Sequence, residues 1–303
     1  MFIVSPPILV LAVLWLDLAL GPIRFALRSI PAPPVVMGRL ARGLSRRLDR
    51  PNRSDRTLKA RGAVLGILLC ASAVVVGWEI HALGTRLLPR WAPAIEAFVF
   101  WGFLRGHLPL ARLREGLRHI GNDDRSSTAA RALLEQTAVS FVHFVIAPIF
   151  WFLLTGLPGV FAAAAAWAID RAAREGGSHK PFGAFARAFE YLLIWIPVRI
   201  AELVLAFAAG LVPRGRPLVA LKQGWNNVAL GQYGAVAALA GGLGVVLPSP
   251  SAGPPDRRWL GDGTARIGRN DVLRATWLYA VALLIISGLL ILLALAERSA
   301  GIG

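Results

Sequence analysis

The stretch EQTAVSFVHFVIAPIFWFLLTGLPGVFAAAAAWAID, residues 135–170, decides the fold class of this chain. It is almost wholly apolar, is interrupted once by Leu157-Pro158-Gly159, and still contains Glu135, His143 and Asp170. A charged side chain near the centre of a bilayer costs about 2.5 kcal/mol or more, so ionisable residues in spanning helices usually face a bundle interior or water. We therefore expect these three groups either to make buried structural contacts or to mark a polar site.

The composition is that of a polytopic membrane protein. Hydrophobic residues make up 56% of the 303, and LYAVALLIISGLLILLALA (278–296) carries no charge. Uncharged runs of this length are typical of spanning helices, which argues against the alternative of a large soluble helical enzyme. The single Cys70 lies within an apolar run, so we expect neither a disulfide nor a cysteine-ligated metal.

We expect an all-α fold with about five to seven spanning helices and one re-entrant helix, forming a single domain over residues 1–303. The first apolar run has no basic residue before it and no small-residue cleavage site after it, which favours an uncleaved span over a signal peptide. Proline and glycine should end a helix at 157–159 and leave Val160–Ile169 as a short re-entrant or tilted segment. The expected spans cover roughly 3–20, 63–83, 92–104, 137–155, 190–211 and 276–296, and the Gly- and Ala-rich segment 226–247 is typical of closely packed membrane helices.

The positive charge is concentrated in two segments. Residues 21–61 hold eleven Arg and Lys against two acids, and residues 105–134 hold six Arg. Such segments either bind nucleic acid or another anion, or orient the chain by the positive-inside rule. The flanking spans favour orientation, with attraction to anionic membrane lipids and no nucleic-acid partner. We predict that both segments are cytoplasmic loops of a protein of the cell (inner) membrane, with further polar loops at 171–189 and 248–275.

Few residues are suited to chemistry. The chain has no P-loop, no HExxH, no GxSxG and no paired Cys/His spacing, so a zinc site or a serine nucleophile is not supported. AGGLG near residue 242 lacks a strand–turn–helix context and indicates close helix packing. Acids beside arginines suit Mg²⁺ and phosphate, although a solvated helix end accounts for each of them separately. The acids near the predicted cytoplasmic face are Asp123, Glu135, Asp170, Glu190 and Asp262.

Two further features, the Arg199–Glu202 pair and His143, have alternative interpretations. Arg199 and Glu202 are three apart on one helical face, so they form either an internal ion pair or part of a site in which Arg199 binds phosphate or carboxylate. His143 is either a hydrogen-bonded interior histidine or a proton carrier.

Several motifs resemble the CobD/CbiB family of cobalamin biosynthesis. LDLALGP (16–22) resembles an LDLLLGDP opening, and APIFWF (147–152) with LPG (157–159) resembles APLFWF…LPG. FG (182–183) and LLIWIPVR (192–199) resemble FG…LLNWIPAR, and RWLGDG (258–263) resembles RPWLGDG without its proline. Their order and spacing hold over essentially the whole chain.

This resemblance implies an integral membrane protein that acts late in corrinoid assembly. The family joins cobyric acid, through a propionate carboxylate, to aminopropanol or its phosphate, as an ATP-dependent amide ligase that uses Mg²⁺. For such an enzyme we expect Glu135, Asp170 and His143 as catalytic residues and Arg199 and Glu190 as substrate- or phosphate-binding residues. Asp123 and Asp262 are the expected magnesium ligands.

Polar positions of the family motifs differ in this chain. The family's ESLAEN..DG segment is EQTAVSFVHF (135–144), and its NTLDSM is WAIDRA (167–172). A GRD-like loop is reduced to Gly121-Asn122-Asp123, and SPNAG.PEA is replaced by ALGQYGAVA (229–237). Three hypotheses therefore stay open: a divergent cobinamide-forming enzyme, a non-catalytic structural or regulatory paralogue, and a small-molecule transporter. The oligomeric state is not predicted.

Overall fold

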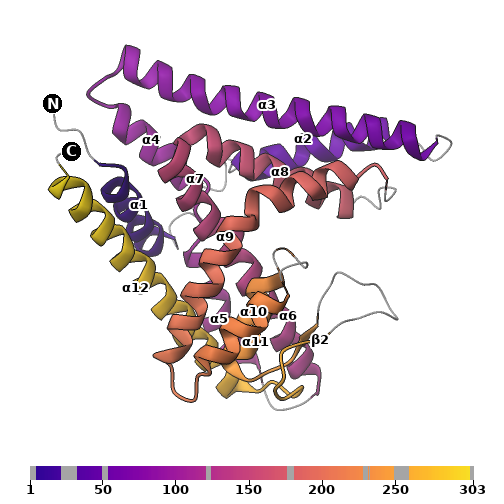
Figure 1. Cartoon of the computed structure of the whole chain (residues 1–303), viewed down its shortest axis with the longest axis vertical. Helices are drawn as coiled ribbons and strands as arrows, with labels where there is room; N and C mark the ends of the chain where they lie inside the picture. The colour runs from indigo at the N-terminus through magenta and orange to yellow at the C-terminus, as the bar shows by residue number, and fades with distance from the viewer. Residues whose placement is uncertain are drawn as a thin grey trace. The chain divides into compact units, whose positions relative to one another are not determined.

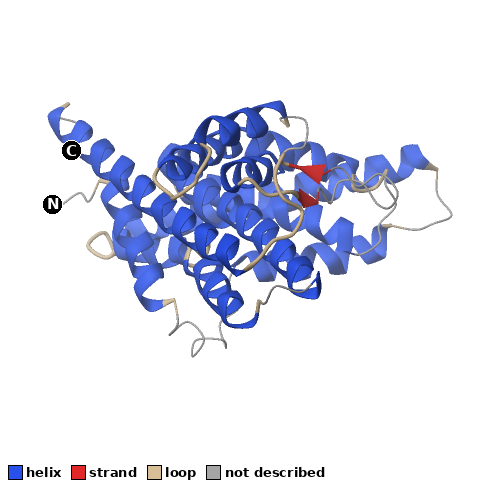
Figure 2. Cartoon of the chain, turned by 90° about the horizontal axis from the view of Figure 1, so that it is seen from below, coloured by secondary structure: helices blue, strands red, loops and turns tan. Residues whose placement is uncertain are grey.

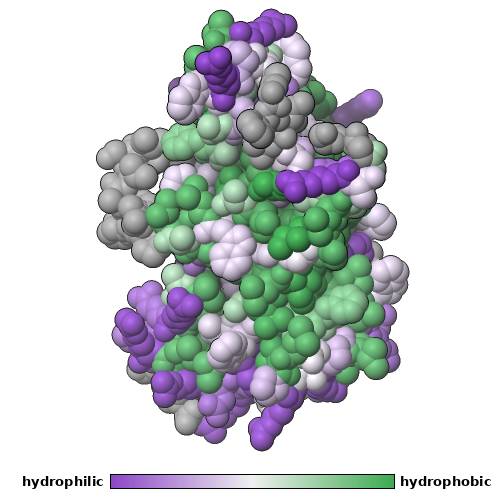
Figure 3. All heavy atoms as spheres, turned by 90° about the vertical axis from the view of Figure 1, so that its left-hand side faces the viewer, coloured by the Kyte–Doolittle hydropathy of each residue, from purple (hydrophilic) through white to green (hydrophobic). Residues whose placement is uncertain are grey.

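The computed structural model describes residues 5–21, 33–49, 54–120, 124–175, 181–227, 231, 233–248 and 259–300. Apart from one antiparallel pair of two-residue strands, β1 (Leu247–Pro248) and β2 (Trp259–Leu260), the regular structure in these ranges is helical (Figure 2). Four helices among the described residues are long and apolar enough to cross a membrane: Asp55–Leu87, Ser126–Thr155, Ala184–Gly210 and Arg269–Ser299. The expected all-α, multi-pass membrane fold is confirmed, and hydrophobic residues cover a broad area of the face in Figure 3.

Three predicted membrane helices are shorter than a full crossing. They are α1 (Pro6–Leu20), α4 (Ala92–Trp101) and α11 (Tyr233–Leu243). Every residue of α11 is buried, so the Gly- and Ala-rich segment predicted to be a closely packed membrane helix contains a short internal helix. The predicted basic loop 21–61 contains helix α2 (Pro33–Leu48), because its apolar and small residues recur at helical spacing.

The chain forms two compact units. Unit 1 comprises Met1–Leu104 and Ala147–Ile194, and unit 2 comprises Arg105–Ile146 and Trp195–Gly303. The predicted loops 105–134 and 171–189 are also partly helical, since α5 (His107–His119) and the start of α6 (Asp124–Phe141) occupy the first and α9 (Ala184–Gly210) begins within the second.

In unit 1, α2, α3 (Asp55–Leu87) and α8 (Leu157–Glu175) pack side by side (Figure 1). Glycines of α3 allow close approaches: a Cβ at Gly77 would lie 2.9 Å from Pro158 of α8, and one at Gly62 would collide with the Phe182 carbonyl, just before α9. Helix α8 has 19 residues, so the short re-entrant segment predicted at Val160–Ile169 is instead the middle of a longer helix.

The chain turns between α7 (Ala147–Thr155) and α8 at Gly156, one residue before the predicted break. Gly156 has φ +70°, a conformation that glycine adopts at little cost. Pro158 does not end a helix there, because it stands in the first turn of α8, where its missing N–H has no helical partner to lose.

One end of unit 2 collects several helix termini. The Ile267 N–H donates to Ser127 Oγ near the start of α6, and Arg269 Nε, in the first turn of α12 (Arg269–Ser299), donates to the Leu117 carbonyl near the end of α5. Arg274 Nε donates to the Pro213 carbonyl, just beyond the end of α9. We call this the polar end of unit 2. It follows that α6 and α12 start at the end of the unit where α9 finishes.

Helices α10 (Pro217–Asn226) and α11 form a hairpin that begins and ends at the polar end (Figure 1). Gly224 approaches Ala238 and Gly241 approaches Val219, so the two helices are antiparallel. Gly234 and Gly242 of α11 lie beside Glu202 and Ala209 of α9, so α11 runs in the same direction as α9. The described hairpin residues Gly224 and Gly234 therefore lie at the level of Glu202, in the second half of α9.

Pro148 of the APIFWF motif changes the helix before it. Proline has no N–H, so the carbonyl of Phe144, four residues earlier, loses its helical partner. The chain forms a π-helical turn at this point, η2 (Val142–Ile146), and the Phe144 carbonyl accepts instead from the Arg105 N–H at 3.1 Å. The Arg105 guanidinium also lies 5.2 Å from the centre of the Phe144 ring.

Pro197 of the WIP motif acts in the same way inside α9. It leaves the carbonyl of Leu193 without a helical donor. The indole Nε1–H of Trp151, from α7, donates to that carbonyl at 3.1 Å. The APIFWF and LLIWIP motifs are therefore joined by a hydrogen bond that the proline makes necessary.

Candidate functional site

A carboxylate with an unpaired oxygen lies in unit 1. Asp170, on α8, is only 4% exposed. Its Oδ2 accepts a hydrogen bond from Arg174 Nε, one turn later, at 2.6 Å. Its Oδ1 is buried and has no hydrogen-bond partner in the described part of the chain. Leaving a buried acceptor unbonded is costly, so this oxygen is a natural contact point for a ligand.

Glu190, from the first half of α9, lies beside Asp170. It is 5% exposed, and the two carboxylates interact electrostatically. Arg174 acts on both acids, and Arg187 acts on Asp170. We call Asp170, Arg174, Arg187 and Glu190 the unit 1 polar cluster. The sequence predicted Asp170 as a catalytic residue and Glu190 as a substrate- or phosphate-binding residue, and the cluster brings the two together. Its two arginines were not predicted as site residues.

Burial controls the protonation of Asp170. Helix α8 is not one of the four helices suited to crossing a membrane. Loss of water around the side chain raises the pKa of Asp170 above its ordinary value, and the positive charges of Arg174 and Arg187 oppose this only in part. Such a carboxyl group can exchange a proton or accept a cation more readily than a solvated aspartate.

The unit 1 polar cluster has the donor set for a hydrated divalent cation. Mg²⁺ is usually bound by one or two carboxylates, with water and substrate phosphates completing its octahedron. Asp170 Oδ1 is free to bind, and Glu190 adds a second carboxylate. No group of three or more His, Cys, Asp or Glu suited to a metal occurs among the described residues, so an all-protein cage is not formed there.

Glu135 and His143 lie elsewhere, in unit 2. Glu135 is on α6 and half-buried, and His143 is buried within the π-helical turn η2. Eight residues of helix separate them by about 12 Å, so they do not form one site with each other. Single π-helical turns are frequent at functional positions, and His143 makes a polar or ring contact within the protein. This geometry agrees with the interior-histidine interpretation.

Of the two expected magnesium ligands, the structure describes only Asp262. Asp123 lies outside the described residues. Asp262 is half-exposed, and its two oxygens accept from the two terminal nitrogens of Arg216 at 3.2 and 3.3 Å. A carboxylate held at both oxygens by a guanidinium fits a metal poorly. In this conformation Asp262 is a salt-bridge partner at the polar end of unit 2.

Arg199 and Glu202 form the ion pair that their spacing suggested. Arg199 Nη1 lies 2.6 Å from Glu202 Oε2, with the two side chains 13% and 1% exposed. The contact lacks hydrogen-bond geometry, so both Glu202 oxygens and the Arg199 Nε and Nη1 remain without hydrogen bonds among the described residues. The Arg199 guanidinium also lies 5.6 Å from the ring centre of Trp225 on α10. Trp225 could not have been assigned from its position in the sequence.

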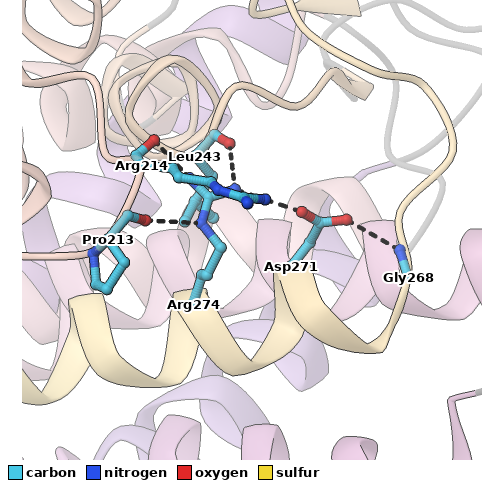
Figure 4. A network of polar contacts seen from close by, with 6 residues as sticks. All are labelled: Pro213, Arg214, Leu243, Gly268, Asp271 and Arg274. Atoms are coloured by element: carbon cyan, nitrogen blue, oxygen red, sulfur yellow. Dashed lines mark hydrogen bonds and ion pairs between the residues drawn. The ribbon is translucent and has the colours of Figure 1, made fainter.

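Arg274 fixes the backbone at the polar end of unit 2 (Figure 4). Its guanidinium donates to the carbonyls of Pro213, Arg214 and Leu243 at 3.2, 2.8 and 3.0 Å, and it pairs with Asp271. Arg214 has φ +58°, which is unusual for a residue with a side chain. Arg274 therefore holds together the α9–α10 turn and the end of α11.

Known proteins resemble this chain over most of its length. The sequence model of the family described as CobD/Cbib protein matches residues 110–279. Cobalamin biosynthesis protein CbiB of Salmonella typhimurium is 27% identical over 290 residues, which cover 86% of this chain and 90% of that protein. Cobalamin biosynthesis protein CobD of Citrobacter koseri is 27% identical over 281 residues, covering 83% and 87%. No solved structure matches.

The family match and the geometry concern the same part of the molecule. Residues 110–279 are more than half of the chain, and they contain the unit 1 polar cluster, the Arg199–Glu202 pair and the polar end of unit 2. The relatives are also covered almost to their full length. The chain belongs to the CobD/CbiB family.

Proposed function

We propose that this protein takes part in cobalamin biosynthesis at the step that converts cobyric acid to a cobinamide. In this reaction a propionate carboxylate of the corrinoid and the amine of aminopropanol, or of its phosphate, form an amide. ATP takes up the carboxylate oxygen that leaves. The observation that carries the proposal is the family match, together with relatives named for cobalamin biosynthesis.

The unit 1 polar cluster is the part of the molecule best suited to the phosphate side of this reaction. Arg174 and Arg187 can pair with phosphate oxygens, and charge on a transferring phosphoryl group is offset mainly by such fixed cations. Asp170 has an unpaired oxygen, and its raised pKa suits it to accept a proton from the attacking amine. Glu190 adds a second buried carboxyl group beside it.

The cluster also supports the expected use of Mg²⁺ with ATP. Asp170 Oδ1 and the Glu190 carboxylate would hold the ion, leaving its remaining positions to water and phosphate oxygens. When bound, Mg²⁺ neutralises phosphate charge. Asp123, Glu135, His143 and Asp262 remain assigned only by resemblance.

We further propose that the protein is inserted in the cell's inner membrane with residues 21–61 and 105–134 on the cytoplasmic side. The arginines of both segments support this orientation by the positive-inside rule. Corrinoid and ATP would then reach the protein from the cytoplasm.

Complementation tests the proposal. A strain that lacks its cobinamide-forming ligase is given the wild-type chain, and its corrinoids are identified by mass. We expect rescue by wild type and by the exposed control Glu115→Gln. Asp170→Asn and Glu190→Gln should lower cobinamide formation by about 100-fold or more, because charge and proton handling at such sites typically contribute that much.

Two results would contradict these assignments. Full activity of an Asp170→Asn, Glu190→Gln double variant would remove the unit 1 polar cluster from the mechanism. A wild-type chain that accumulates in the membrane without rescuing the strain would favour the non-catalytic paralogue, which the replaced polar motif residues also suggest.

A further inference from the structure

The chain passes between its two compact units at three places, which we call the first, second and third crossings. They lie at residues 104–105, 146–147 and 194–195. The second and third crossings fall inside two of the helical segments long enough to cross a membrane, Ser126–Thr155 and Ala184–Gly210. The two units therefore share two long helices, and any motion between the units must bend both of them.

Each crossing coincides with a break in regular helical structure. The first lies in the non-helical stretch between α4 and α5. The second directly follows the π-helical turn η2 and precedes Pro148, and the third directly precedes Ile196 and Pro197 within α9. Prolines and π-helical turns are the usual causes of bends in long helices. The boundary between the units thus falls where these helices bend most readily.

Both prolines remove a helical hydrogen bond that would have joined the two units. At Pro148 the missing bond would end on the carbonyl of Phe144, and at Pro197 it would end on the carbonyl of Leu193. In each case the carbonyl belongs to one unit and the proline to the other. Bending at the second and third crossings therefore breaks fewer backbone hydrogen bonds than bending elsewhere in the same helices.

The two freed carbonyls are bonded within their own units. The Phe144 carbonyl accepts from the Arg105 N–H, both in unit 2, and the Leu193 carbonyl accepts from Trp151 Nε1, both in unit 1. Neither bond has to break when the units turn. The bonds also show that the crossings are neighbours, because one joins the chain at the first and second crossings and the other joins α7 to α9 close to the second and third.

The first crossing is short and is fixed on both sides. Phe103 packs edge-on against Phe161 in unit 1, with 4.8 Å between the ring centres. The Gly106 carbonyl accepts from the Tyr279 hydroxyl in unit 2 at 2.9 Å. Leu104 and Arg105 alone connect these two contacts along the chain, so rotation about their backbone bonds turns one unit against the other.

We propose that the three crossings form a hinge about which unit 1 and unit 2 turn as packed bodies. Hinges in proteins consist of a few loop or element-terminal residues that absorb the backbone rotation. At the first crossing the two linking residues absorb it. At the second and third crossings the helices absorb it where proline has removed a hydrogen bond.

The hinge has a consequence for the residues predicted to act in catalysis and binding. Asp170 and Glu190 belong to unit 1, whereas Glu135, His143 and Arg199 belong to unit 2. Turning at the hinge changes the separation between these two groups. In enzymes, domain motions of this kind admit substrate and exclude water during the reaction. This role rests on the proposed function, but the hinge itself can be tested without activity.

Distances between spin labels test the hinge in the full chain. Pairs of exposed residues are changed to cysteine on a Cys70→Ser background and measured in nanodiscs by double electron–electron resonance. Arg46→Cys with Arg118→Cys reports on the distance between the units. Arg46→Cys with Leu88→Cys lies within unit 1, and Arg118→Cys with Leu218→Cys lies within unit 2. We expect the pair between the units to give a clearly wider distance distribution than either pair within a unit.

Replacing the prolines tests whether they make the hinge. The Pro148→Ala, Pro197→Ala double variant restores both helical N–H groups, so the extra width of the distribution between the units should be lost. The matched control is Pro217→Ala. Pro217 stands in the first turn of α10, where its missing N–H has no helical partner to lose, so this variant should keep the full width.

Amide hydrogen exchange gives a second measurement that needs no labels. In Pro197→Ala, the amides of residues 194–199 should exchange about tenfold more slowly than in wild type, because one restored hydrogen bond contributes roughly that factor. Pro217→Ala should leave their exchange rate unchanged.

Three results would overturn the proposal. The first is a wild-type distribution between the units that is no wider than those within them. The second is a folded double variant that keeps the full width, since the motion would then arise elsewhere. The third, which decides the matter if the double variant does not fold, is an unchanged exchange rate in Pro197→Ala. These outcomes do not depend on whether the wild-type chain complements the ligase-deficient strain.

Discussion

The buried carboxylate of Asp170 is held at an energetic cost that its neighbours only partly offset. Burial raises its pKa above the ordinary value of 3.8, and the opposing effects of Arg174 and Arg187 are smaller. The folded state therefore holds the Asp170 proton to higher pH than the unfolded chain does. As pH rises from about 3.8 through the raised pKa, this residue makes the fold progressively less stable, and the loss stays constant above that range.

Asp170→Asn should separate stability from function. The neutral amide removes the buried charge, so we expect a variant that unfolds at higher temperature than wild type at neutral pH and whose stability depends less on pH above about 4. Its cobinamide formation should be lost at the same time, as is common when a destabilised residue serves a site. Thermal unfolding in detergent across pH, measured beside Glu115→Gln as control, checks this. A variant that is both less stable and fully active would contradict it.

At the scale of secondary-structure elements, two motif prolines create free carbonyls that other elements then use. Pro197 frees the Leu193 carbonyl, which accepts from Trp151. Trp151→Phe should therefore cost about 1–2 kcal/mol, the usual effect of leaving a part-buried acceptor unbonded. In a Pro197→Ala background the carbonyl regains a helical N–H, and Trp151→Phe should cost clearly less. A double-mutant cycle of unfolding free energies measures the difference, and equal costs in both backgrounds would show that the indole contributes only packing.

Arg274 also links secondary-structure elements, because its side chain donates hydrogen bonds to three backbone carbonyls from two segments of unit 2. We expect Arg274→Met to destabilise the protein by about 3 kcal/mol and Arg274→Lys by somewhat less, because lysine cannot reproduce the planar fork. Arg298→Met, near the end of the same helix, is the control. The unfolding temperatures of the three variants test this prediction. If Arg274→Met is as stable as wild type, the turn at Arg214 is held by its own backbone and not by the Arg274 side chain.

The sequence was sufficient to predict the helical class and the long apolar spans, because uncharged hydrophobic runs of spanning length are rare in soluble proteins. It was not sufficient for 226–247, where the Gly- and Ala-rich composition predicted close helix packing but not that α11 is the returning arm of a hairpin. The Asp170–Glu190 contact also escaped prediction, since pairing between separate helices leaves no periodic signal. Pro148 and Pro197 do carry a signal in the sequence, because the carbonyl four residues before a proline inside a helix loses its helical donor.

At the scale of the whole molecule, the described helices imply an orientation that can be measured. In unit 2 the first turns of α12 contact both the end of α5 and the α9–α10 turn, so Arg118 and Leu218 lie near the same end of that unit. If the long helices span the membrane, these two positions must face the same side of it. The positive-inside rule adds Arg46 to that side, and the span Asp55–Leu87 places Leu88 on the other.

Single cysteines introduced on a Cys70→Ser background at positions 46, 118, 218 and 88 test this orientation with a membrane-impermeant maleimide. We expect Arg46→Cys, Arg118→Cys and Leu218→Cys to react in inverted membrane vesicles, and Leu88→Cys to react in spheroplasts. The four native residues are exposed, so failure to react reflects the side of the membrane and not burial. Labelling of 118 and 218 from opposite sides would mean that Ser126–Thr155 and Ala184–Gly210 do not cross as antiparallel spans.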